Sequence, residues 1–133
     1  MIVEDDPDDC ELIQAALNEI GVNRDLRCFT NGEEALKYLQ TTTESMFLII
    51  SDINMPKMNG LEFRKKINEN PELVKKSIPF VFLTTSVAEK SVQAAYEMMV
   101  QGYFKKPDTF DEMKDLLRLT VDYWINCKHP KSL

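Results

Sequence analysis

The chain has 133 residues, and 44% of them are hydrophobic, which is enough apolar material for one domain with a packed core. Its formal net charge of -6 argues against nucleic-acid binding, because contacts with a phosphate backbone need a basic stripe. No apolar run approaches the roughly 18–20 residues of a membrane span, so we expect a cytoplasmic protein whose partners are other proteins.

Short apolar runs, typical of buried strands, alternate along the chain with apolar residues at helical spacing. Polar residues mark helix starts: Asp6 stands before Pro7, and Ser86 with Glu89 has the spacing of a capping box. In chain order, the pattern predicts a strand at Ile2-Val3, a helix over 7–20, a strand at 26–29, a helix over 32–39, a strand at 46–50, a helix over 60–67, a strand at 80–83, a helix over 86–100, a strand at 103–104 and a helix over 109–126.

Strands that alternate with helices are typical of an α/β fold with right-handed crossovers. The five predicted strands and five predicted helices therefore indicate a doubly wound, mostly parallel sheet, with residues 1–126 as one domain and residues 127–133 as a polar C-terminal tail. Ligands in such folds lie beyond the carboxyl ends of the strands. The residues that follow each strand are therefore the candidates for a site.

Five polar or charged side chains lie at the ends of the predicted strands. They are Glu4 and Asp5 after the first strand, Asp52 after the third, Thr84 after the fourth and Lys106 after the fifth. At a shared edge of the sheet, three crowded carboxylates repel one another unless a cation and a lysine neutralise them. An all-oxygen ligand set favours Mg²⁺, so we expect these side chains to meet at a magnesium site.

The acidic run continues beyond the first predicted strand with Asp6, Asp8 and Asp9. Acidic residues favour the first turn of a helix, where they cap free amides and complement the helix dipole. We therefore assign these three residues to the helix start and not to the metal.

Three cysteines, Cys10, Cys28 and Cys127, stand far apart with no CxxC pair. An odd number at wide spacing indicates neither a disulfide framework nor a zinc site. We expect three free thiols.

Four motifs at the strand ends match those of a known family. They are Val3-Glu4-Asp5-Asp6, Ser51-Asp52-Ile53-Asn54-Met55-Pro56-Lys57-Met58-Asn59-Gly60, Leu83-Thr84-Thr85-Ser86 and Lys105-Lys106-Pro107. In this order and spacing, the chain resembles the CheY-like response-regulator receiver family over nearly its whole length. The resemblance implies a five-stranded parallel sheet of order 2-1-3-4-5 in a flavodoxin-like three-layer sandwich.

The resemblance also implies roles for the acidic residues. Asp52 is the phosphorylation site, which accepts a phosphoryl group from the phosphohistidine of a sensor histidine kinase or a phosphotransfer protein. The Mg²⁺ ligands are Asp5, Asp52 and the backbone carbonyl of Asn54, and Glu4 acts through a metal-bound water.

The same resemblance implies how the site signals. Lys106 and Thr84 bind the phosphoryl oxygens, and movement of Thr84 lets the aromatic switch residue Tyr103 turn inward. The bond before the predicted cis-proline, Pro107, aims the lysine across the site. The expected chemistry is phosphorylation and dephosphorylation of Asp52 itself, so we do not expect an enzyme.

The last predicted helix is apolar on more than one face. Beyond its inward stripe it carries Leu116, Leu119 and Tyr123, and the preceding helix carries Met98 and Met99. We expect a kinase or a second copy to cover this surface, the latter in a homodimer through the fourth predicted helix, the fifth strand and the last helix. No output domain is expected, so the chain is similar to stand-alone regulators, in particular to those paired with phytochrome-like histidine kinases.

Three other interpretations stay open from the sequence. A haloacid-dehalogenase-like phosphatase also uses an aspartyl phosphate and Mg²⁺, but it needs a second aspartate where this chain has Asn54. A pseudo-receiver keeps the fold as an interaction module but lacks some of the site residues. A flavodoxin-like FMN carrier needs a phosphate-binding loop after the first strand, and the chain has none.

Overall fold

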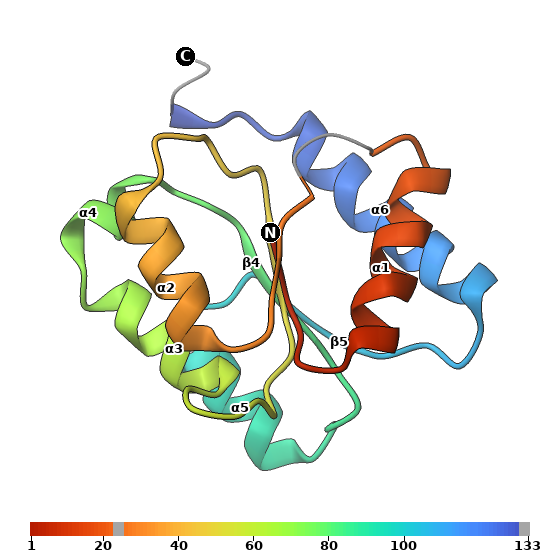
Figure 1. Cartoon of the computed structure of the whole chain (residues 1–133), viewed down its shortest axis with the longest axis horizontal. Coiled ribbons are helices and arrows are strands. Elements are labelled where there is room, and N and C mark those ends of the chain that lie inside the picture. Colours follow the sequence, from red (N-terminus) through yellow and green to blue (C-terminus); the bar gives the residue numbers. More distant parts are fainter. Residues whose placement is uncertain (23–25, 131–133) are drawn as a thin grey trace.

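Five parallel strands form one sheet at the centre of the molecule (Figure 1). The computed structural model describes residues 1–22 and 26–130. The strands are β1 (Ile2–Val3), β2 (Cys28–Phe29), β3 (Ile49–Ser51), β4 (Phe80–Thr84) and β5 (Gly102–Lys105). They lie in the order β2-β1-β3-β4-β5, and each neighbouring pair is parallel. The predicted sheet and its strand order are confirmed.

Helices cover both faces of the sheet, as buried parallel strands require. The helices are α1 (Pro7–Glu19), α2 (Gly32–Thr41), α3 (Gly60–Asn68), α4 (Pro71–Lys75), α5 (Glu89–Glu97) and α6 (Phe110–Asn126). Helices α1 and α6 lie on one face, and α2, α3 and α5 lie on the other, which gives the predicted three layers (Figure 1). Among the described residues, no helix is long and apolar enough to cross a membrane.

The short helix α4 is an addition to the five predicted helices, all of which are present. Asn70 caps α4 by accepting hydrogen bonds from the amides of Glu72 and Leu73, and Pro71 stands at its start. These are ordinary signals for a helix start. The helix has only 5 residues, however, which is too few to show a helical repeat of apolar side chains.

Helix α5 begins later than predicted. Its first residue is Glu89, and the residue before it, Ala88, makes no side-chain cap. Ser86 lies in the loop between β4 and α5, where its amide donates to Thr84 Oγ1 at 3.4 Å and its hydroxyl lies 3.3 Å from Ser91 Oγ. The predicted capping box of Ser86 with Glu89 is therefore wrong, because Ser86 turns back toward the end of β4.

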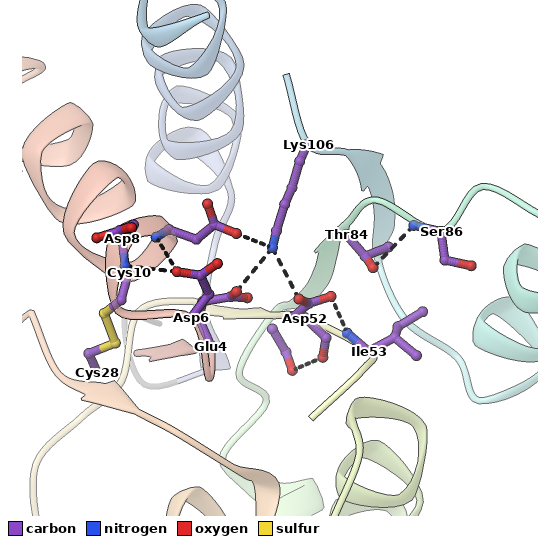
Figure 2. A network of polar contacts seen from close by, with 12 residues as sticks. Glu4, Asp6, Asp8, Cys10, Cys28, Asp52, Ile53, Thr84, Ser86 and Lys106 are labelled. Atoms are coloured by element: carbon purple, nitrogen blue, oxygen red, sulfur yellow. Dashed lines mark hydrogen bonds and ion pairs between the residues drawn. A yellow bond between two sulfur atoms is a disulfide. The ribbon is translucent and has the colours of Figure 1, made fainter. Parts of the chain in front are cut away.

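Two of the three cysteines are joined by a disulfide, Cys10 on α1 and Cys28 on β2 (Figure 2). The prediction of free thiols is therefore wrong for this pair, whereas Cys127 is free and exposed. Cys10 belongs to the core between the sheet and helices α1 and α6, and the partly buried Cys28 packs against this core. This packing places their Cα atoms 6.8 Å apart although 18 residues separate them in the chain, and sequence spacing does not reveal such a contact.

The apolar core on the other face of the sheet contains three aromatic rings from α3 and β4. Phe63 of α3 and Phe80 and Phe82 of β4 are fully buried. Their ring centroids lie 5.6 Å apart for Phe63 and Phe80 and 5.1 Å apart for Phe80 and Phe82. Such a close-packed cluster fixes the strands that carry the site.

Helix α6 ends at Asn126, where the sequence places the end of the domain. In the segment that follows, a ring nitrogen of His129 lies 2.9 Å from the Lys76 carbonyl oxygen. Residues 131–133 of the predicted tail lie outside the described residues.

Candidate functional site

The carboxyl ends of four strands meet at one edge of the sheet. The register of β1 with β3 and of β4 with β5 places Glu4, Asp52, Thr84 and Lys106 at this edge. Figure 2 shows the Lys106 side chain extending from the end of β5 toward Glu4 and Asp52. The structure thus brings together the side chains that the sequence predicted at the strand ends.

The Lys106 ammonium group is the centre of this cluster. Its Nζ atom lies 2.7 Å from Asp9 Oδ2, 3.0 Å from Glu4 Oε1 and 3.1 Å from Asp52 Oδ2. Burial alone would lower the pKa of Lys106, but the hydrogen bonds to Asp9, Glu4 and Asp52 outweigh burial and raise it. Lys106 therefore carries a positive charge at neutral pH, and each of its three N–H donors has a carboxyl oxygen to bind.

Asp52 is buried, oriented and ionised. Its Oδ1 atom accepts a hydrogen bond from the Ile53 amide at 2.7 Å, while Oδ2 faces Lys106. Burial acts to raise the pKa of Asp52, but the interactions with Thr84, Glu4 and Lys106 together lower it below its ordinary value. A carboxylate that stays charged in a buried position is suited to act as a nucleophile.

Glu4, Asp5 and Asp52 form a group that could hold a metal ion, with one oxygen of each within 4.8 Å of the others. Glu4 and Asp52 are buried, and Asp5 is exposed. Among the described residues, Glu4 Oε2 is a buried oxygen without a hydrogen-bond partner. Burial first, and then the Asp52 carboxylate, raise the pKa of Glu4 to about 8. An unpartnered oxygen among crowded carboxylates fits a hard divalent cation such as Mg²⁺.

Asn54, the remaining residue of the predicted metal site, is exposed in the loop after β3. Its predicted ligand is the backbone carbonyl, two residues beyond Asp52 in the chain. That role stays a prediction.

The two predicted switch residues, Thr84 and Tyr103, contact the same residue of the β4–α5 loop. Thr84 is fully buried, and its hydroxyl accepts a hydrogen bond from the Ser86 amide at 3.4 Å. Tyr103 is partly buried, and its hydroxyl donates to the Ser86 carbonyl. Ser86 therefore connects the residue beside Asp52 to the aromatic residue of β5, although the switching roles themselves stay predictions.

The peptide bond between Lys106 and Pro107 is not cis. The described residues contain no cis peptide bond, so the predicted cis-proline is wrong. The Lys106 amide donates to the Thr84 carbonyl at 2.8 Å, which continues the pairing of β4 with β5 and directs the side chain into the site. The trans isomer, which is the more stable form of most X–Pro bonds, is sufficient for this geometry.

Asp9 is the site residue that the sequence pattern missed. Asp6 caps α1 as predicted, through the amides of Asp8 and Asp9, but the Asp9 side chain reaches Lys106. The sequence does indicate that the first turn of α1 lies near the site. The helix starts directly after β1, at the edge of the sheet where the site was expected. The pattern did not show which acid of that turn faces inward.

Comparison with known proteins identifies the family. The family model for the response regulator receiver domain matches residues 1–118. Response regulator Rcp1 of Synechocystis sp. is 32% identical over 130 residues, which cover 94% of this chain and 87% of Rcp1.

Solved structures give the same result. The phosphorylated cyanobacterial phytochrome response regulator RcpA has a TM-score of 0.86 at 29% identity, covering 97% of this chain and 95% of that chain. The Mn²⁺-bound form of Rcp1 has a TM-score of 0.82 at 30% identity, covering 96% of this chain and 94% of that chain. This chain therefore belongs to the response regulator receiver domain family, with the CheY-like fold.

Proposed function

We propose that this chain is a phosphoacceptor in a two-component relay, in which Asp52 takes a phosphoryl group from a sensor histidine kinase or a phosphotransfer protein. The observation that carries the proposal is the buried Asp52 carboxylate at the end of β3. It is held between the Ile53 amide at 2.7 Å and the Lys106 ammonium group at 3.1 Å. This arrangement keeps the nucleophile charged and orients it.

The groups around Asp52 suit phosphoryl transfer, which depends on positioning and charge stabilisation. Lys106 presents a positive charge, and Thr84 presents a buried hydroxyl. Mg²⁺ would be held by Asp5, Asp52 and the Asn54 carbonyl, and Glu4 would act through a metal-bound water. When bound, Mg²⁺ would neutralise charge on the phosphoryl oxygens. We propose no separate substrate, so the chain would not be an enzyme beyond the phosphorylation and dephosphorylation of its own Asp52.

Two similar proteins support these assignments. RcpA is a phytochrome response regulator solved in a phosphorylated state, and Rcp1 has been solved with Mn²⁺ bound. We propose by analogy with RcpA that the kinase of this chain is phytochrome-like. The oxygen ligands of the site favour Mg²⁺ as its divalent cation. We also propose that the relay operates in the cytoplasm.

The alternatives considered from the sequence have no support. The matched family is the receiver family, not that of the phosphatases or the flavodoxin-like FMN carriers. A pseudo-receiver would lack part of the site, whereas this chain brings the acidic group and Lys106 together.

The proposal predicts that a small phosphodonor with Mg²⁺ adds one phosphate to the wild-type protein and none to Asp52→Asn, as measured by intact mass. Asp122→Asn is the matched control, because Asp122 is exposed on α6 and loses the same charge. Leaving out Mg²⁺ should prevent the reaction in the wild type. Phosphorylation of Asp52→Asn at the wild-type level would contradict the proposal.

We also propose that a second copy of the chain covers the surface formed by α5, β5 and α6. Leu119 and Tyr123 are 71% and 63% exposed and lie one turn apart on α6. They line a groove that also contains Phe104 of β5, and Met99 after α5 is 73% exposed. Exposed apolar side chains that line one groove, as Leu119 and Tyr123 do, are typical of an interface. Leu116 and Met98, also predicted here, are partly buried.

The homodimer predicts that Tyr123→Lys weakens self-association by roughly tenfold or more, because aromatic residues near the centre of an interface contribute most to binding. Analytical ultracentrifugation over a range of concentrations measures this change. Ile125→Lys is the control, since Ile125 is also exposed on α6, at 64%, but does not line the groove. A wild-type protein that stays monomeric at high concentration, with and without a phosphate analogue, would exclude the dimer.

A further inference from the structure

Asp9 makes the shortest contact with Lys106, and none of the roles assigned above accounts for it. Its Oδ2 atom lies 2.7 Å from Lys106 Nζ, compared with 3.0 Å for Glu4 and 3.1 Å for Asp52. Glu4 and Asp52 follow strands, whereas Asp9 lies in the first turn of α1. Asp9 is also outside the group of three acids that could hold a metal ion.

The three partners of Lys106 therefore differ in what else they do. Asp52 is the proposed phosphoryl acceptor, and Glu4 belongs to the proposed metal site. Asp9 is the partner with neither task, so its carboxylate remains available to Lys106 throughout the reaction. A lysine side chain has a flexible four-carbon stem, and a charge that stabilises a transition state must be held in place.

The first turn of α1 is well fixed, as an anchor requires. Asp6 Oδ1 accepts a hydrogen bond from the Asp9 amide at 3.4 Å. The next residue, Cys10, is joined to Cys28 of β2. The Asp9 side chain is 36% exposed, and that of Lys106 is 12% exposed, so the ion pair is only partly screened by solvent.

We propose that Asp9 is a positioning residue, which holds the Lys106 ammonium group beside Asp52 during phosphoryl transfer. The inference rests on the proposed function of Asp52. It assigns the acidic first turn of α1 a part in the reaction, in addition to the capping of the helix by Asp6. Asp9 acts through Lys106 and does not itself contact the transferred group.

The test measures phosphorylation by a small phosphodonor at saturating Mg²⁺. Asp9→Asn should lower the maximal rate by about tenfold with little change in the donor concentration that gives half of that rate, and Asp9→Glu should restore part of it. Asp8→Asn is the matched control, because Asp8 is exposed in the same turn and loses the same charge. Its rate should equal that of the wild type.

A double variant separates positioning from a general effect on the fold. In the Lys106→Ala background, Asp9→Asn should cause no further loss, since Asp9 acts through the lysine. An unchanged or faster rate in Asp9→Asn, or an equal loss in both backgrounds, would overturn the inference. Absence of any phosphorylation in the wild type would instead overturn the proposed function of Asp52, so the two failures are distinguishable.

Discussion

Replacing Gly60 with alanine should lower the free energy of unfolding by roughly 2–4 kcal/mol and slow the phosphorylation of Asp52. A Cβ atom at Gly60 would overlap the Asp52 carbonyl oxygen and lie 2.8 Å from Phe82 Cε1. The Gly60 amide also donates to the Ile53 carbonyl at 2.8 Å, so α3 starts directly against the backbone that carries Asp52. The overlap must displace either α3 or Asp52. Urea denaturation measures the first effect, and the phosphodonor assay measures the second.

Gly21→Ala is the control for this substitution. Gly21 has a φ of 95°, with nothing within 4 Å of an added Cβ atom. Its replacement should cost about 1–2 kcal/mol through left-handed backbone strain alone and should leave phosphorylation unchanged. Equal losses of stability in the two variants, or wild-type phosphorylation in Gly60→Ala, would show that contact with the Asp52 backbone is unimportant.

Reduction of the Cys10–Cys28 disulfide should lower the free energy of unfolding by about 3 kcal/mol. The bond joins residues 18 apart in the chain, and a loop of this length restricts the unfolded state by about that amount in the chain-entropy model. Urea denaturation with and without a dithiol reductant measures the difference. Because the disulfide joins α1 to β2 within one cooperative domain, we expect reduction to move the whole unfolding transition to a lower urea concentration.

Thiol counting tests the same bond directly. Alkylation of the unfolded, unreduced protein should add one group, at Cys127, and reduction beforehand should raise the number to three. Cys127→Ser should keep the stability change on reduction, whereas Cys10→Ser should lose it. Three added groups without reduction would contradict the pairing.

The limits of β3 show what an apolar pattern can and cannot predict. The sequence pattern placed this strand at 46–50, but β3 spans Ile49–Ser51. Ile49 pairs with Phe80, the first residue of β4, so the residues before it have no strand beside them on that side. Phe47, which lies within the predicted strand, is 47% exposed and therefore not part of the buried sheet. Hydrophobicity indicates burial, but the partner strand sets the length of the pairing.

The site was predictable where it depends on topology and less so where it depends on side-chain direction. Parallel strands end at one edge of a sheet, so Asp52 and Lys106 could be expected to meet. Local packing decides the other features. These are the direction of the Asp9 side chain toward Lys106, the contact of Cys10 with Cys28 and the trans bond before Pro107. The spacing of apolar residues in the sequence does not indicate such local contacts.

The long chain separation between the acids and the lysine has a consequence for biosynthesis. Glu4 and Asp52 precede Lys106 by 102 and 54 residues. During translation, both acids are therefore synthesised well before the lysine that pairs with them. A domain generally folds as one unit, so the repulsion between Glu4 and Asp52 is relieved only when β5 has docked beside β4. Docking of the last strand is therefore the event that brings the Lys106 ammonium group to these acids.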